Sequence, residues 1–246
     1  MAAKIIKLGT LYVDGKPQGG CPCNVFEKSI TIGDGVRGKK IEWLSIGNRL
    51  VARGVVCTDV SWDTLDKQGL IKGKVVTIDD KSYICRSLRV GGNAEDKENE
   101  WSDIVQKVGD SDKVWGSRDL RFWGQDSYSD YPVFRAIRSL DSEHPFTYGF
   151  PDAFNNQLGF KPVLEPLGDA GTLATLLSAE VDVALPFATI RGPLVSVDDY
   201  DICIQAEADI PLDCDYIITH DGTIVVKRPF VSWVGGLNGP YIAANK

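Results

Sequence analysis

The feature that most constrains this chain is the stretch from Glu100 to Leu164, where aromatic, arginine and serine residues lie close together without a regular period. The apolar face of a helix repeats about every 3.6 residues and a half-buried strand about every second residue, and neither repeat is present. We therefore expect an irregular, loop-rich scaffold that presents side chains, rather than a helix or a strand ladder. The irregular part is expected to run from Trp115 to Phe160.

Length and composition predict a globular protein. The chain has 246 residues, of which 43% are hydrophobic and 25% charged, enough for one large or two modest domains. Its net charge is -7, and no basic run could follow a phosphate backbone, so we expect no nucleic-acid partner. Residues 1–7 lack the apolar core of a signal peptide, and no window approaches the roughly 20 apolar residues of a membrane span. We expect synthesis and folding in the cytoplasm, without membrane insertion.

The first hundred residues read as short strands with two short helices. A helix capped by Ser61 should end near Gly69, and a second one beginning at Asn99 should end near Gly109. Trp101 lies at helical spacing with other apolar residues and is expected to anchor the core. Asp79-Asp80 indicates a hairpin turn. The expected strands are 4–13, 30–32, 41–46, 50–57, 74–78 and 82–88.

The composition changes at residues 166–169. The part before it is rich in Trp, Arg and Gly, whereas the part after it carries short runs of β-branched residues separated by prolines and turns. We therefore predict two domains, 1–168 and 169–246, the second a small all-β domain. His220–Thr223 is expected to form a hairpin turn. The expected strands are 181–185, 194–197, 202–204, 210–212, 217–218 and 224–226.

Several motifs occur in a recognisable order: Val60–Leu65, Gly73–Asp79, Tyr83–Leu88, Asn99–Trp101, the Trp/Arg-rich centre and Gly159–Leu164. In this order, over about residues 60–167, the chain resembles phage and prophage proteins with a C-type-lectin-like domain of the formylglycine-generating-enzyme type. The closing motif of that family usually carries Arg where this chain has Lys161. The resemblance implies a β-rich α+β fold: a C-type-lectin-like domain with few short helices, followed here by the small all-β domain.

Catalytic and metal-binding patterns are weak. Enzymes of the resembled type need a pair of reactive cysteines near their ligand groove, and no cysteine lies between Cys85 and Cys203. His144 and His220 lie in turn sequences rather than beside a nucleophile. Cys21-Pro22-Cys23 is too tight for the usual zinc spacing, and no second pair completes a site. We expect reduced thiols, no metal, no cofactor and no enzyme activity.

Two segments are candidate contact surfaces. Tyrosine gives a large contact area at low entropy cost, and Ser and Asp supply adaptable hydrogen bonds. The alternative is that the tryptophans fill the core and the arginines brace loop carbonyls. The candidate binding surface consists of Trp115, Arg118, Arg121, Trp123, Asp126, Tyr128, Tyr131 and Arg135.

The second segment is the apolar, Gly-rich stretch 230–242, unusual for a chain end. It would either dock on its own domain or pack against a neighbouring subunit. The candidate oligomer contacts in it are Phe230, Trp233, Leu237 and Tyr241.

The resemblance and the missing catalytic set favour a non-enzymatic structural protein of a phage virion, associated with the tail or capsid. It would act by protein or glycan binding, with host receptor binding as one form. Its partners would be other virion proteins or a host surface protein or glycan, and we expect a homo-oligomer within an assembly. One alternative is a cytoplasmic phage inhibitor of a host defence protein, which the net charge of -7 weakly favours. A formylglycine-generating enzyme is the other, and the cysteine positions argue against it.

Overall fold

The computed structural model describes residues 4–47, 49–93, 96, 99–116, 120–129, 131–136, 146–168, 170–185, 188–198, 200–206, 217–220, 222–236 and 241–243. The chain divides into two compact units, Met1–Glu165 (unit 1) and Pro166–Lys246 (unit 2). The division falls at the start of the segment where the composition changes. Strands dominate both units, and the three α-helices of the described residues are short, so the protein is β-rich with a minor helical part.

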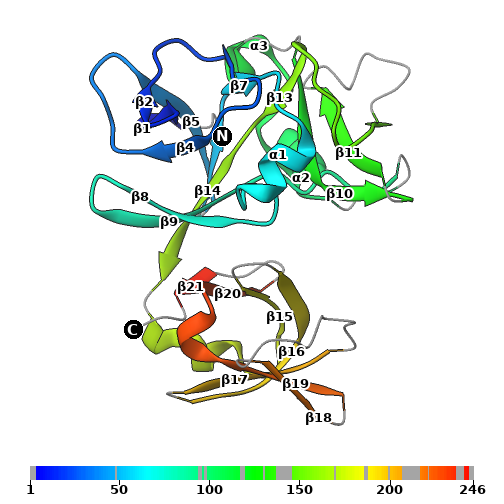
Figure 1. Ribbon diagram of the computed structural model, residues 1–246. Coiled ribbons are helices and arrows are strands. Elements are labelled where there is room, and N and C mark those ends of the chain that lie inside the picture. The colour runs from blue at the N-terminus through cyan, green and yellow to red at the C-terminus, as the bar shows by residue number, and fades with distance from the viewer. Residues whose placement is uncertain are drawn as a thin grey trace. The chain divides into compact units, whose positions relative to one another are not determined.

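The first sheet of unit 1 follows the strand order β14–β6–β5–β1–β2, with β4 also paired to β1 and the β8–β9 hairpin joined through β9 to β14 (Figure 1). Asp79 and Asp80 both have positive φ, 49° and 63°, as a tight hairpin turn requires, so the expected turn is confirmed. The strands are β1 (Lys4–Val13), β2 (Lys16–Pro17), β4 (Ile30–Gly33), β5 (Lys40–Ile46), β6 (Arg49–Ala52), β8 (Lys74–Ile78), β9 (Lys81–Arg86) and β14 (Val163–Gly168). The strand expected over 50–57 is divided between β6 and β7.

The second sheet of unit 1 has the order β12–β11–β10–β13–β7–β3. Its strands are β3 (Cys23–Asn24), β7 (Cys57–Thr58), β10 (Arg121–Tyr128), β11 (Tyr131–Ala136), β12 (Phe146–Tyr148) and β13 (Leu158–Phe160). The antiparallel pair β10–β11 is clear in Figure 1. The expectation of an irregular chain from Trp115 to Phe160 was therefore wrong for the residues of β10, β11, β12 and β13.

The missing period of this stretch has a physical cause. Neighbouring residues of β10 enter two different apolar clusters. Phe122 belongs to the cluster that contains Trp101 and Trp115 (the second core), whereas Trp123 belongs to the cluster that contains Trp43 and Phe160 (the first core). Val133 and Phe134 on β11 divide in the same way. Because both faces of the hairpin are buried, the strands carry consecutive apolar residues rather than an alternating pattern.

The helices of unit 1 begin where the sequence predicted. Ser61 Oγ accepts the backbone N–H of Thr64 at the start of α1 (Trp62–Lys67), and Asn99 Oδ1 accepts that of Ser102 at the start of α2 (Glu100–Val108). Gly109 ends α2 with a φ of 78°. A short α3 (Asp112–Trp115) follows. Trp101 and Ile104 are buried, so the predicted core role of Trp101 is confirmed.

A buried charge cluster connects four elements of unit 1. The guanidinium of Arg86 donates to both carboxylate oxygens of Glu100, at 2.8 and 2.7 Å, and to Glu165 Oε1. Arg49 also donates to Glu100, as does the backbone N–H of Arg89 at 2.9 Å. Burial opposes ionisation of Glu100, but the attraction and hydrogen bonds of Arg86, with help from Arg49, lower the pKa of Glu100 to about 2. The cluster therefore holds α2 against β6, β9 and β14.

Lys161 is a second buried basic side chain, and it has a different environment. Its side chain is fully buried, and its ammonium donates to the backbone carbonyl of Ala52. The Nζ atom lies 4.4 Å from the ring centroid of Trp115 and 5.9 Å from those of Trp101 and Phe122. Burial lowers the pKa of Lys161 well below its ordinary value of 10.5. The aromatic rings and one carbonyl thus partly compensate the loss of water around this amine.

Unit 2 is a small β unit with the strand order β18–β19–β17–β16–β15–β20–β21, where β21 pairs in parallel with Leu167 and Gly168 of β14. Buried residues alternate with more exposed ones along β16, β17 and β19, so one face forms an aliphatic core. The sequence predicted β17 and β19, but the expected break at Pro193 was wrong, because β16 runs from Thr189 through Pro193 to Val197. The expected strand 210–212 lies outside the described residues. The elements are η1 (Ala170–Leu176), β15 (Glu180–Ala184), β16 (Thr189–Val197), β17 (Asp201–Gln205), β18 (Ile217–His220), β19 (Thr223–Lys227), η2 (Arg228–Phe230), β20 (Trp233–Gly236) and β21 (Tyr241–Ala243).

Replacing Glu100 by Gln should destabilise unit 1 by about 3 kcal/mol at pH 7, because the guanidinium of Arg86 stays buried without its main counter-charge. The measurement is urea unfolding followed by tryptophan fluorescence, since all tryptophans except Trp233 belong to unit 1. Ionised Glu100 stabilises the fold above its ordinary pKa of 4.5, and this contribution is lost as the pH falls toward 2. The difference between the two proteins should therefore shrink over that range. Asp103→Asn, on the exposed side of α2, is the control, and an equal loss there would contradict the assignment.

Replacing Lys161 by Met should remove a pH dependence of stability. The lowered pKa of Lys161 means that the unfolded chain binds more protons than the folded one up to pH 10.5, so the unfolding free energy of the original protein should rise with pH in that window. Denaturant unfolding at several pH values between about 7 and 10 measures this slope. The slope should be smaller in Lys161→Met and unchanged in Lys67→Met, which alters an exposed lysine of α1. If the unfolding free energy changed with pH at the same rate in all three proteins, burial of Lys161 would not be the cause of the pH dependence.

Candidate functional site

Four exposed aromatic side chains gather at one end of the second sheet of unit 1. Tyr128 and Tyr131 are opposite partners beside the β10–β11 turn, and the pairing of Val133 with Tyr148 brings β12 alongside. Ring centroids lie 5.4 Å apart for Tyr128 and Tyr148, and 5.9 Å apart for Tyr131 and Tyr148. The ring of Phe150 is 5.5 Å from Tyr131. We name Tyr128, Tyr131, Tyr148 and Phe150 the aromatic surface.

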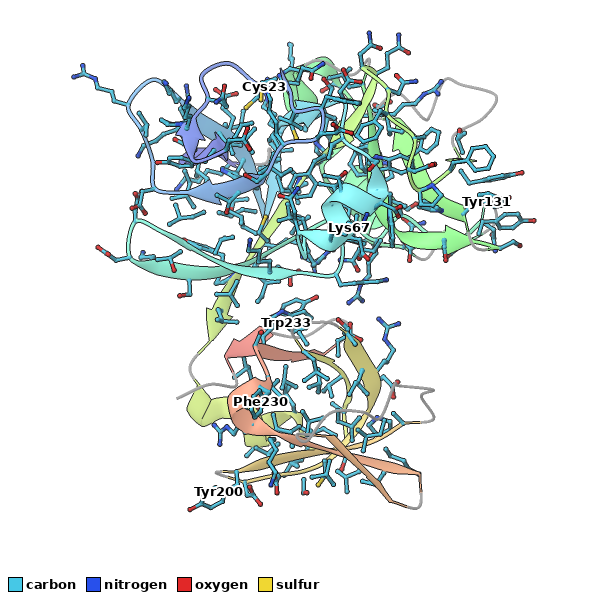
Figure 2. The ribbon with its side chains drawn as sticks, viewed as in Figure 1. Cys23, Lys67, Tyr131, Tyr200, Phe230 and Trp233 are labelled. Atoms are coloured by element: carbon cyan, nitrogen blue, oxygen red, sulfur yellow. The ribbon has the colours of Figure 1, made fainter. Side chains whose placement is uncertain are left out.

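The aromatic surface is accessible. Its four side chains are between 39% and 64% exposed, although each ring already contacts another one. Figure 2 shows the Tyr131 side chain at the outer end of the β10–β11 hairpin. Large contiguous exposed apolar groups are uncommon on monomeric proteins and usually mark an interaction site.

The backbone between Tyr148 and Phe150 lies against the first core. Phe134 and Trp123 meet edge to face at 5.3 Å, and Trp123 Nε1 donates to the carbonyl of Val60 at 2.8 Å. Gly149, between Tyr148 and Phe150, lies against Phe134 so closely that a side chain there would come within 3.1 Å of its ring. The glycine thus lets the end of β12 approach the core. The three tyrosines are therefore carried by paired strands rather than by a free loop.

The structure brings together only part of the predicted binding surface. Tyr128 and Tyr131 belong to it, whereas Trp115 and Trp123 are fully buried in the two cores, so their assignment to a surface is corrected. Asp126 is also a structural residue, since its Oδ2 atom accepts the backbone N–H groups of Val90 and Gly91. The two tryptophans thus follow the alternative in which they fill the core, and Asp126 was not foreseen as a structural residue.

The predicted arginines are not part of the aromatic surface as described. Arg121 is exposed at the opposite end of β10 from Tyr128, with its guanidinium 5.8 Å from the Phe134 ring. Arg118 lies outside the described residues, and only the backbone of Arg135 is described, in β11. Sequence reasoning missed Tyr148 and Phe150, because their approach depends on the pairing of β11 with β12. The available signal was the run Tyr148-Gly149-Phe150, two aromatics around a glycine.

The C-terminal apolar segment is mostly part of the sheet of unit 2. Trp233 and Tyr241 are buried, and their rings meet at 4.7 Å between the paired strands β20 and β21. Both residues are thus corrected from oligomer contacts to packed residues of the chain itself. Phe230 remains exposed at 46% and is labelled in Figure 2 with Trp233. Leu237 lies outside the described residues.

Three thiols lie near one another in unit 1. Cys23 and Cys57 are partners in the β3–β7 pairing, and Cys21 lines a cavity of about 330 Å³. A thiol over a cavity is one arrangement of a catalytic nucleophile, which requires a low pKa. Here desolvation, followed by repulsion from Cys23, raises the pKa of Cys21 to about 11, although the residue as a whole is exposed. Burial also raises the pKa values of Cys23 and Cys57. The protonated thiol is the wrong form for nucleophilic attack.

Comparison with protein-family models, curated proteins and solved structures finds no match to this chain. Within the described part of the chain, His, Cys, Asp and Glu side chains form no group of three or more arranged to hold a metal ion. Of the described helices, none has the length and apolar character needed to cross a membrane. His144 lies outside the described residues, and His220 ends β18. The functional argument therefore depends on the sequence motifs and on the geometry of the aromatic surface.

Cys21 should react slowly with iodoacetamide at pH 7, because the thiolate is the reactive form and a pKa of about 11 keeps it scarce. Mass spectrometry of the peptide that carries Cys21 measures its alkylation rate, which should still be rising between pH 9 and about pH 11. A short unstructured peptide of the same sequence is the control, and its rate should level off near the ordinary thiol pKa of about 8.5. Faster alkylation of the folded protein at pH 7 would reverse the conclusion and favour the enzyme alternative.

Proposed function

We propose that this chain is a non-enzymatic structural protein of a phage virion, associated with the tail or capsid, and that it binds its partner through the aromatic surface. The virion assignment is supported by the order of motifs from Val60 to Leu164. On the same basis, we propose a C-type-lectin-like fold for about residues 60–167. The two capped helices, the β8–β9 hairpin and the strands of the second sheet are compatible with that proposal.

The observation that carries a binding function is the group of exposed, mutually packed rings. Tyrosine side chains bury a large area on contact and lose few rotatable bonds, so a fixed group of them gives affinity at low entropy cost. The pairing of β11 with β10 and β12 fixes the backbone that carries the three tyrosines before a ligand arrives, which lowers the ordering cost further. Phenolic hydroxyls at the rim would add hydrogen bonds.

The proposed ligand is a protein or a glycan, either of which can pack against rings and hydroxyls. Immobilised chain should retain its ligand from one of three sources: disrupted virions, host envelope fractions or host cytosol. Retention of a virion protein or of an envelope protein or glycan supports the virion proposal, and a stoichiometric cytosolic host protein supports the inhibitor alternative. Retention from none of them would count against a binding function.

We also propose that the chain assembles with copies of itself, as virion proteins commonly do in symmetric arrays. Phe230 is the member of the expected contact set that the structure leaves exposed, at 46%. Light scattering after size-exclusion chromatography, over a range of concentrations, tests the proposal. A mass of 26.9 kDa at every concentration would contradict it.

Replacing Tyr148 by Ala should weaken ligand binding at least about tenfold, because Tyr148 contacts both other tyrosines of the aromatic surface. The unfolding free energy should change by less than about 1 kcal/mol, since the side chain is half exposed. Tyr200→Ala removes an exposed tyrosine of unit 2 and is the matched control. Biolayer interferometry against the retained ligand gives both affinities. Equal affinities of the two variants would show that the aromatic surface is not the binding site.

A further inference from the structure

Cationic side chains surround two adjoining cavities of unit 1, away from the aromatic surface. The cavities have volumes of about 330 and 530 Å³, and Gly38 and Lys40 line both. Among the described lining residues, Glu42 contributes the one carboxylate, against five cations. This is a local excess of positive charge in a chain whose net charge is -7. The cations are Lys7, Arg37, Lys39, Lys40 and Arg53.

The loop between β4 and β5 carries Arg37 and Lys39, leads directly into Lys40 at the start of β5, and is held by hydrogen bonds. The backbone N–H of Val36 donates to Thr10 Oγ1 at 2.8 Å, and that of Gly35 donates to Asp79 Oδ1 at 3.1 Å. A turn bond from Lys39 N to the carbonyl of Val36, at 3.0 Å, completes the loop. Cations on a fixed loop need little ordering when an anion binds.

The five cations differ in how far they are neutralised. Arg53 and Lys7 share the carboxylate of Glu42, at 2.8 and 3.2 Å. Lys40 is 4.0 Å from Asp79, the limit of an ion pair. Lys39 donates to the uncharged carbonyl of Pro17 at 2.9 Å. Within the described residues, no carboxylate pairs with Arg37 or Lys39, so these two charges are available to an anion from solution.

A glycine places the lysine that both cavities share. A Cβ atom at Gly35 would lie 2.6 Å from Lys40 Cε and 2.9 Å from its Nζ, so the lysine side chain lies across the bare backbone. The φ of Gly35 is outside the left-handed region, and alanine is therefore compatible with the backbone there. Gly35→Ala would displace the Lys40 ammonium without changing any charge.

We propose that these cavities bind a small ligand through a phosphate or sulfate group. Guanidinium and ammonium groups donate strong, charge-assisted hydrogen bonds to such oxyanions. The cavity volumes fit a small molecule, and the net negative charge of the chain disfavours a long polyanion. Lys40 lines both cavities, so a ligand with two oxyanion groups would place one group in each cavity, with Lys40 between them.

Pyrophosphate is the probe, titrated into the full chain at an ionic strength kept constant with chloride and followed by ¹H–¹⁵N NMR. The expected result is saturable binding with shifts at the residues of the β4–β5 loop. Arg37→Gln combined with Lys39→Gln should weaken binding at least about tenfold. Lys107→Gln, an exposed lysine of α2 outside the cavities, should leave it unchanged. Shifts that never saturate, or equal affinity in the double variant, would overturn the proposal.

Two further measurements test the position of Lys40 and the kind of ligand. Gly35→Ala should weaken pyrophosphate binding while its urea unfolding midpoint stays near that of the original chain, and an unchanged affinity would argue against the assigned role of Lys40. Inorganic phosphate, inorganic sulfate and glucose 6-phosphate distinguish a free ion from a group on a larger ligand, since tighter binding of the sugar phosphate assigns the site to the latter. Tyr148→Ala should bind pyrophosphate with unchanged affinity. The proposal for the cavities and the proposal for the aromatic surface are therefore tested separately.

Discussion

The ion pair between Glu100 and Arg86 is the interaction on which the architecture of unit 1 depends most. It joins the first turn of α2 to the end of β9, and Arg49 and Glu165 extend it to β6 and β14. A buried ion pair adds little net stability compared with apolar packing, but removal of one partner leaves an uncompensated charge. The cluster therefore acts mainly on the specificity of the fold, because a different position of α2 would leave buried charges without partners.

The position of α2 then determines the aromatic packing. Trp101 follows Glu100 directly, and its ring meets those of Trp115 and Phe122, each at 5.0 Å. Phe122 belongs to β10, so the helix supports the hairpin whose far end carries the aromatic surface. Lys161 lies among the same three rings, and its Nζ atom donates to the carbonyl of Ala52 on β6. Two buried basic side chains, Arg86 beside carboxylates and Lys161 among rings, thus contact the helix that carries Trp101.

Sequence reasoning succeeded where structure is determined locally. The caps at Ser61 and Asn99 and the Asp79-Asp80 turn depend on a few neighbouring residues, and each was predicted, as were β17 and β19 of unit 2. It failed for β10 and β11, because two cores on opposite faces of a hairpin erase the alternation by which a strand is recognised.

The same limit explains the partial prediction of the sites. Tyr128 and Tyr131 were found because they are close in the sequence, and Trp115, Trp123 and Asp126 were included for the same reason, although they are structural. Tyr148 enters the aromatic surface only through the register of β12. The cationic cavities are lined by residue 7, the segment 37–40 and residue 53, which are far apart in the sequence. No local sequence pattern indicates that they lie together.

The two-sided burial of the β10–β11 hairpin has an evolutionary consequence. Residues along its shaft are constrained from both faces, so a change there disturbs one core or the other, whereas the rings at its tip are bounded by solvent on one side. Mutation can therefore alter the tip while the shaft stays constant. Sequence change at the tip therefore alters the exposed surface of the protein while the packing that stabilises its fold is kept.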